Sequence, residues 1–181
     1  MDPLREYNIA FVGLKTGEHR FTYNIDRTFF EQFPDSLIKE CNVKVDLKLT
    51  KENSFMMLDF QISGTLEQPC NRCQRPLNYP VDADYNVLVK FGEAPEKEDA
   101  ESDEDVVYLD RNETHLNVAQ LVYEFITLAI PVHRVVCENV GLECDPSVLK
   151  VLNDLNEQKE NTPDPRWADL KNIKFNRGLK D

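Results

Sequence analysis

The chain has 181 residues, is 41% hydrophobic and carries a formal net charge of −12. This length suits one domain with appendages, and no apolar run reaches the roughly 18 residues that a membrane span needs. The negative charge excludes non-specific binding of polyanions over the whole surface, because phosphate contacts need Lys and Arg. The N-terminus lacks a basic start followed by an apolar block, so we expect no signal peptide and a cytoplasmic protein.

Alternating apolar residues predict that the first half of the chain forms β-strands. The alternation covers residues 7–11 and 21–25, on either side of a turn bounded by glycines, and so predicts an N-terminal hairpin. Asp26 can then cap a short helix that Pro34 ends.

Three longer alternating segments follow, and short connections join them. They cover residues 43–49, 56–62 and 79–91, and strands in series with short connections favour an antiparallel meander. Together with the hairpin, these strands predict a mainly antiparallel β-sheet or a partly closed barrel. Gly64 falls where we expect a bulge or a close approach of the backbone.

The pattern changes after residue 92. Residues 93–105 hold eight acids and one Lys, which is −7 of the net charge, and have no apolar periodicity, so we expect a disordered acidic loop. A short strand at 106–109 precedes a helix that Asn117 can cap and Pro131 ends.

Asp145-Pro146 predicts the start of another helix, because Pro is favoured at the first helical position. We therefore expect an α+β fold with C-terminal helices packed on or beside the sheet. Its parts are a β-rich half at 1–92, the acidic loop, a helical part of the same domain at 106–160 and a C-terminal tail at 161–181.

Four cysteines in two pairs are the strongest chemical signal. Cys70 and Cys73 form a C-x-x-C, in which a tight turn can aim two thiolates at one ion. Cys137 and Cys144, with six residues between them, can complete a tetrahedral, structural Zn²⁺ site. The odd total of five cysteines and the lack of an export signal favour reduced thiols or metal over disulfides.

Other interpretations of these cysteines stay open. The thiols can lie in loops with partial or no metal, and His133 can replace one ligand. A catalytic redox pair is a further option, although no predicted helix follows the C-x-x-C to lower a thiol pKa. The sequence has no Gly-rich phosphate loop, nucleophile elbow or paired catalytic acids, so we expect no enzymatic activity and no catalytic residues.

Basic and aromatic residues suggest a surface that binds RNA or a protein partner. Arg72 and Arg75 flank the first thiol pair and, with Arg134, can form a small cationic patch for phosphate. Arg166 and Trp167 lie in the D-P-R-W of the tail, and Trp is enriched at binding hot spots. The alternatives are ordinary surface arginines and a Trp167 that packs on its own domain.

Taken together, these features resemble the YceD family of bacterial proteins, whose name derives from accumulation of large-subunit ribosomal RNA. The resemblance covers residues 5–175. Its most specific parts are the G-x5-C-x-R-C that ends at Cys73 and the E-x-x-x-L-x-x-P that ends at Pro131. The D-P-R-W of the tail resembles family members from the Bacteroidota.

The resemblance implies a non-enzymatic factor in large-subunit biogenesis. It would support synthesis, processing or stability of 23S rRNA by binding rRNA or a nascent assembly. One alternative is an acidic adaptor or chaperone for a basic ribosomal protein, without RNA contact. A thiol oxidoreductase is the third interpretation.

Overall fold

The computed structural model describes residues 3–92, 106–131 and 135–160, and side chains as far as residue 157. The acidic loop and the C-terminal tail predicted from the sequence lie outside the described residues.

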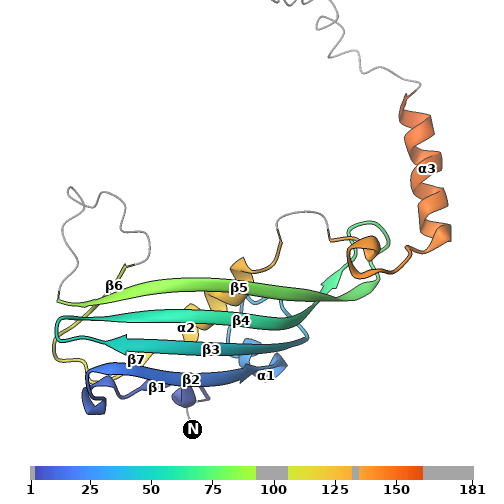
Figure 1. The fold of residues 1–181 in the computed structure, drawn as a ribbon. Helices are drawn as coiled ribbons and strands as arrows, with labels where there is room; N and C mark the ends of the chain where they lie inside the picture. Colours follow the sequence, from blue (N-terminus) through green and yellow to red (C-terminus); the bar gives the residue numbers. More distant parts are fainter. Residues whose placement is uncertain (1–2, 93–105, 132–134, 161–181) are drawn as a thin grey trace, which may run out of the picture.

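A five-stranded sheet forms the centre of the fold (Figure 1). Its first four strands follow the chain order and run antiparallel, which confirms the meander, and its last strand is short and parallel to its neighbour. The outer strands do not pair with each other, so the sheet is open and does not close into a barrel. The strands are β2 (Gly17–Ile25), β3 (Cys41–Lys51), β4 (Phe55–Pro69), β5 (Pro76–Phe91) and β6 (Val106–Leu109).

The prediction of an N-terminal hairpin is wrong. Two 3-10 helices, Arg5–Tyr7 and Phe11–Gly13, flank the two-residue strand β1 (Asn8–Ile9). β1 pairs with β7 (Leu116–Asn117), from the second half of the chain, instead of with β2. The apolar residues that alternate in this segment are all buried, so the alternation marked burial correctly but not a long strand.

Two helices begin where capping residues satisfy their free backbone N–H groups. Asp26 precedes α1 (Arg27–Phe30), and its Oδ1 accepts a hydrogen bond from the Thr28 backbone at 2.9 Å. Asn117 plays the same role just before α2 (Ala119–Leu128), where its Oδ1 accepts from the backbone N–H of Ala119 at 2.8 Å. Asp26 is therefore the N-cap that the sequence predicted, whereas Asn117 lies one residue before the N-cap Val118 and still accepts a bond from the first turn of α2.

The helix α2 lies behind the sheet in Figure 1 and packs on its apolar face. Strand side chains alternate between the two faces, so β3 and β4 each bury every second residue against the helix. Phe125 of α2 packs against two strand residues, with ring centroids 5.1 Å from Phe60 and 4.4 Å from Tyr85.

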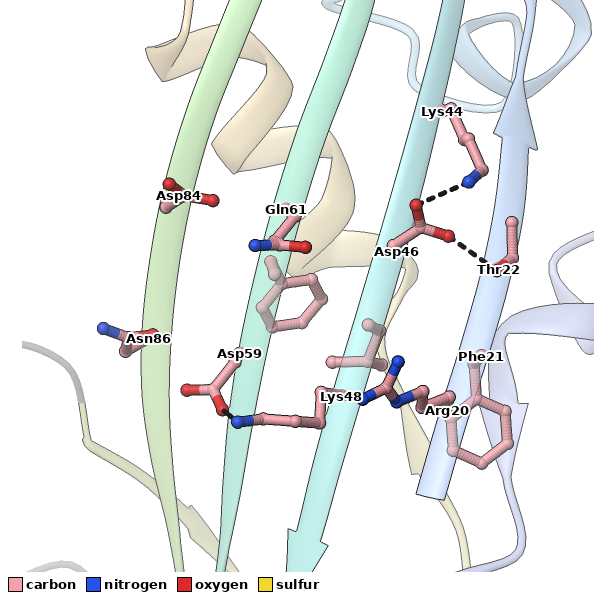
Figure 2. A pocket seen from close by; sticks show the side chains of 12 residues that line it. Arg20, Phe21, Thr22, Lys44, Asp46, Lys48, Asp59, Gln61, Asp84 and Asn86 are labelled. Carbon is pink, nitrogen blue, oxygen red and sulfur yellow. Dashed lines mark hydrogen bonds and ion pairs between the residues drawn. The ribbon is translucent and has the colours of Figure 1, made fainter. Parts of the chain in front are cut away.

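The opposite face of the sheet is polar and slightly hollow, with a volume of about 750 Å³ (Figure 2). Its charged residues largely pair across or along the strands. Lys48 and Asp59 form an ion pair at 2.7 Å, and Lys44 and Asp46 form one at 2.6 Å. Lys44 and Asp46 are two residues apart on β3, whereas Lys48 meets Asp59 only because the register places β3 and β4 side by side.

Gly64 allows two strands to approach each other closely, as the sequence predicted. It lies in β4 opposite Val43 of β3, with a φ of +153°. A Cβ atom at this position would lie 2.2 Å from the carbonyl oxygen of Asn42 and 2.7 Å from the Cα of Val43. Any side chain here would therefore force β3 and β4 apart.

The last helix, α3 (Pro146–Glu160), starts at the predicted residue and extends away from the sheet (Figure 1). Asp145 caps it, since its Oδ1 accepts from the Ser147 backbone at 2.9 Å. Its apolar stripe, which includes Leu152 and Leu155, is largely uncovered by the described residues, and these two side chains are 37% and 50% exposed. None of the described helices combines the length and the apolar character that crossing a membrane requires.

Candidate metal centre

The first two cysteines lie in the tight turn that joins β4 to β5. Pro69 and Pro76 form the last pair of the ladder before this turn. Inside the turn, the Cys70 N–H donates to the Arg75 carbonyl at 2.8 Å, and the Gln74 N–H donates to the Cys70 carbonyl at 2.9 Å. These bonds fold the C-x-x-C so that both sulfurs point to the same side.

The second pair is carried by a compact loop between α2 and α3. Cys137 begins the 3-10 helix Cys137–Val140, which ends at Gly141 in the left-handed conformation with φ +72°. The carbonyl of Cys137 accepts a hydrogen bond from the Leu142 N–H at 2.9 Å. The six residues between Cys137 and Cys144 therefore form one helical turn and a chain reversal, which places Cys144 next to Cys137.

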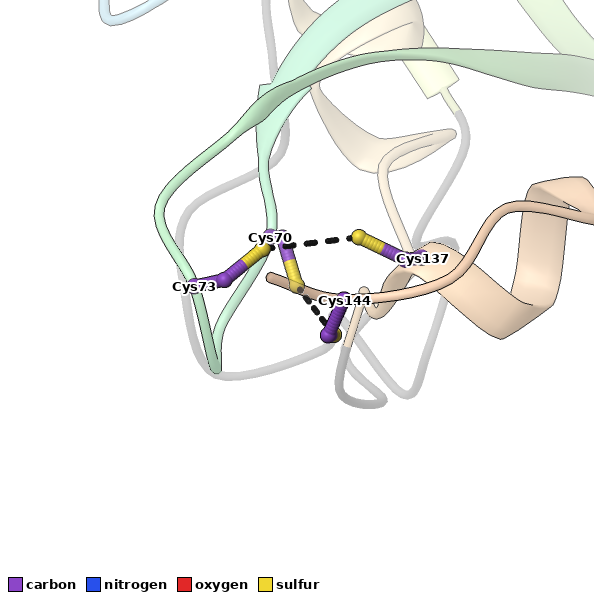
Figure 3. A group of neighbouring side chains, drawn as sticks. All are labelled: Cys70, Cys73, Cys137 and Cys144. Carbon is purple, nitrogen blue, oxygen red and sulfur yellow. Dashed lines mark hydrogen bonds between the residues drawn. The ribbon is translucent and has the colours of Figure 1, made fainter. Parts of the chain in front are cut away.

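The sulfur atoms of all four cysteines lie close together (Figure 3). Cys70 Sγ lies 3.7 Å from Cys144 Sγ, and Cys73 Sγ lies 3.5 Å from Cys137 Sγ. Every sulfur is within 4.8 Å of the others. The distances exceed the roughly 2.0 Å of a disulfide bond and are close to the edge of about 3.8 Å expected for four thiolates around one tetrahedral ion with bonds of about 2.3 Å.

The four cysteines are therefore placed so that they can hold one metal ion. We call these cysteines and the turns that carry them, residues 69–76 and 135–145, the cysteine junction. Cys70 and Cys137 are fully buried, Cys144 is 5% exposed, and Cys73 is partly exposed. All five cysteines of the chain are free thiols, including Cys41, which lies outside the junction.

Backbone and ionic contacts also connect the two halves of the junction. The Asn71 N–H donates to the Val135 carbonyl at 2.7 Å. Arg72 Nη1 lies 2.6 Å from Glu138 Oε1, and Arg75 Nη1 donates to the Glu143 carbonyl at 3.2 Å. Both arginines therefore bridge from the first turn to the second loop.

The protein environment shifts the pKa values of the four thiols in opposite directions. At Cys70 burial opposes ionisation, but backbone N–H groups of Cys73, Arg72 and Cys137 outweigh it and lower the pKa to about 6. Backbone hydrogen bonds from Arg75 and Asp145 also lower the pKa of Cys73. Burial raises the pKa of Cys137 to about 12 and also raises that of Cys144.

The lowered pKa values of Cys70 and Cys73 favour the thiolate, which is the form that binds a metal ion, in two of the four ligands. N–H groups that point at sulfur are the type of outer contact that orients metal ligands. Burial disfavours the charged form of Cys137 and Cys144, and a bound cation would offset that cost for the second pair. The sequence argument considered only a helix after the C-x-x-C as a cause of a lowered thiol pKa, so it missed these backbone N–H groups.

Only some of the other predicted site residues lie in the part of the chain that the structure describes. Arg72 and Arg75 lie at the junction, although their side chains are occupied by the second loop. Arg134, Arg166 and Trp167 lie outside the described residues, as does His133. The cationic patch of three arginines therefore stays a prediction.

The comparisons with known proteins identify a family. A family model described as large ribosomal RNA subunit accumulation protein YceD matches residues 58–174, which is more than half of the chain. The matched segment contains β5, α2 and all four cysteines of the junction. Comparisons with curated proteins and with solved structures gave no match.

Proposed function

The chain belongs to the YceD family, and on this premise we propose that it acts in the cytoplasm as a non-enzymatic factor in large ribosomal subunit biogenesis. It supports 23S rRNA synthesis, processing or stability by binding rRNA or a nascent assembly. The family description itself refers to the accumulation of large-subunit rRNA. The observation that carries the proposal is this match, which spans the whole cysteine junction.

The junction holds a structural Zn²⁺ ion in this proposal. Four thiolate ligands close a tetrahedral site, whereas catalytic zinc sites keep one position open for water or substrate. Zn²⁺ suits four sulfur ligands, and the free, reduced thiols are available to bind it. The ion would connect the loop that precedes α3 to the turn between β4 and β5.

The burial of Cys70 argues against the thiol oxidoreductase. A redox cysteine needs a nucleophilic thiolate that a partner disulfide can reach. Cys73 also has a lowered pKa and is partly exposed, but its partner in the C-x-x-C, Cys70, has a lowered pKa and is fully buried. The N–H groups that lower its pKa therefore support metal ligation better than thiol exchange.

One observation favours the acidic adaptor as the second candidate function. The arginines predicted to contact phosphate are engaged with the second loop, through an ion pair of Arg72 with Glu138 and a hydrogen bond from Arg75. The net charge of −12 also favours a basic client over a nucleic acid. In this alternative the chain accompanies a basic ribosomal protein without touching RNA.

A pull-down from native lysate, with and without nuclease, tests the two functions. RNA binding predicts recovery of 23S fragments that falls with salt and weakens in the double variant Arg72→Ala, Arg75→Ala. Glu138→Gln is the matched control, because it breaks the same ion pair and leaves both arginines in place. Equal loss in both variants would point to a disturbed junction instead of lost phosphate contacts.

The adaptor predicts the opposite pattern. A basic protein would be recovered after nuclease treatment, would survive the arginine changes and would depend on the acidic residues 93–105. Recovery of neither large-subunit RNA nor a ribosomal protein would contradict both functions.

A further inference from the structure

The strand β5 has a long open edge. It covers Pro76–Phe91, but β6 pairs only with its last four residues, from Leu88 onwards. Between residues 81 and 87, the side of β5 that faces away from β4 pairs with no strand in the described part of the chain. Such an edge offers a row of unpaired N–H and C=O groups to another extended chain.

The register shows which residues present these groups. The Glu52 N–H donates to the Phe55 carbonyl at the hairpin between β3 and β4, which fixes the alternation of the ladder. Even-numbered residues of β5 consequently face away from β4, and Pro80, which has no N–H, lies on this outer side. Asp82, Asp84 and Asn86 therefore present their backbone groups to the open edge.

The same residues give the edge a negative charge. Asp82 and Asp84 have exposed side chains, and neither forms an ion pair or hydrogen bond with a described residue. Their cross-strand neighbours on β4 are Ser63 and Gln61, which are uncharged. An incoming strand would align alternate side chains with these carboxylates, so Lys or Arg at every second position would complement them.

From this geometry we propose that the open edge of β5 at residues 81–87 binds an extended, basic protein segment as an added strand. Backbone hydrogen bonds would supply affinity, and the two aspartates would select positive charge. The inference deepens the adaptor alternative by naming a surface for its client. Its test measures peptide binding alone, so it can fail while the role in rRNA accumulation holds, and the reverse.

The other edge of the sheet provides an internal control. The outer side of β2 is also unpaired among the described residues. The same alternation points Glu18, Arg20, Thr22 and Asn24 to that side, which is a mixture of charges. A basic strand would meet Arg20 there, so of these two edges β5 suits it.

The test uses the full chain and a synthetic peptide of eight residues with Lys at alternate positions and Val or Thr between them. Amide hydrogen exchange followed by NMR reports where it binds. We expect the amides of Asp82, Asp84 and Asn86 to exchange about tenfold more slowly with bound peptide, and those of β2 to be unchanged. A peptide with Glu in place of Lys should give no protection.

Two variants separate backbone pairing from charge. Asp84→Pro removes an outward N–H without breaking the β4 ladder and should weaken binding about tenfold. Arg20→Pro makes the matched change at the β2 edge and should leave affinity unchanged. Asp84→Asn keeps the N–H and should weaken binding about two- to threefold at low salt, and less at high salt.

Several outcomes would overturn the inference. One is protection at β2 or at no edge, which would mean that Pro80 and the aspartates only guard β5 against pairing. Others are equal binding of the Glu peptide, unchanged affinity in a folded Asp84→Pro protein, or protection of the same amides by a single-stranded RNA octamer. Should Asp84→Pro fail to fold, the exchange pattern of the unmodified chain and the Asp84→Asn variant decide.

Discussion

The central sheet and the cysteine junction are stabilised in different ways. The sheet buries apolar side chains in one continuous core, to which β2, β3, β4 and β5, the short strands β1 and β7, and the helices α1 and α2 contribute. The junction has a small apolar cluster, formed by Cys70, Leu77, Val135, Val136, Cys137 and Cys144. Burial spread over many residues tolerates the loss of one contact, whereas a junction of two distant segments depends on the few groups that join them.

The difference extends to α3, because that helix follows directly after Cys144. Its Leu149 packs against the junction cluster, while Leu152 and Leu155 are 37% and 50% exposed. The direction of α3 therefore depends on the junction and not on the sheet. An ion bound by the four thiols would fix both the junction and the direction of α3.

Loss of the metal should have the largest effect and should be confined to the junction. We expect the purified chain to hold one zinc per molecule, and Cys144→Ser to abolish it. Structural zinc contributes about 10–16 kcal/mol of apparent binding energy in small domains, so amides at residues 137–144 should lose protection while those of β3 keep theirs. Metal analysis and hydrogen exchange measure the two effects.

Cys41→Ser is the control for that experiment. Cys41 is partly buried, and its Sγ donates to the Ile25 carbonyl at 3.6 Å, well outside the junction. The variant should keep its zinc and its junction amides should stay protected. Substoichiometric zinc in protein purified without a chelator would refute the zinc site.

Truncation of the core should produce the reverse pattern. Phe60→Ala removes a fully buried ring that packs on Phe125, and we expect it to lower the free energy of unfolding by about 3–5 kcal/mol. The zinc content of the folded protein should not change. Urea unfolding measures the loss, with Met57→Ala on the solvent face of the same strand as a control that costs under about 0.5 kcal/mol.

Gly64→Ala tests the close contact between β3 and β4. We expect a loss of about 3 kcal/mol, because a strained φ and a clash with the Asn42 carbonyl act together. Gly92→Ala isolates the first cause, since Gly92 has φ +135° and no atom within 4 Å of an added Cβ. It should cost about 1–2 kcal/mol in the same urea experiment. Equal losses would mean that crowding at Gly64 contributes nothing.

Local sequence patterns predicted the parts of the fold that local physics determines. The alternation at residues 43–49 and 79–91 marks half-buried strands, and Asp145-Pro146 marks a helix start, because each depends on neighbouring residues only. The two cysteine pairs likewise identified the four thiols that the structure brings together.

Long-range pairing could not be predicted from the same patterns. β1 pairs with β7 through only two residues, and no local signal selects that partner over β2. The apolar stripe of α3 has helical spacing, but spacing does not say whether another element covers it. The bond between Arg72 and Glu138 joins residues 66 positions apart, so it was visible only once the junction was folded.

The smallest expected effect is a gain in stability from a change in the core. The hydroxyl of Tyr23 is buried and has no hydrogen-bond partner among the described residues. An unsatisfied polar atom costs about 1–3 kcal/mol, so Tyr23→Phe should raise the free energy of unfolding by about 1 kcal/mol, measured by urea unfolding at pH 7. A loss of stability would show that the hydroxyl makes a bond, through water or through a residue outside the described part of the chain.

The same variant should change how stability depends on alkaline pH. Burial, assisted by the charge of Glu6, raises the pKa of Tyr23 from 10.0 to about 12. The folded state therefore holds this proton more tightly than the unfolded state, and the resulting stability, complete below pH 10, is lost as the pH rises through 12. Tyr23→Phe should lose less stability over that range. Tyr7 and Cys41 would supply the alkaline loss that remains in the variant, because burial also raises the pKa values of these two groups in the core of the sheet.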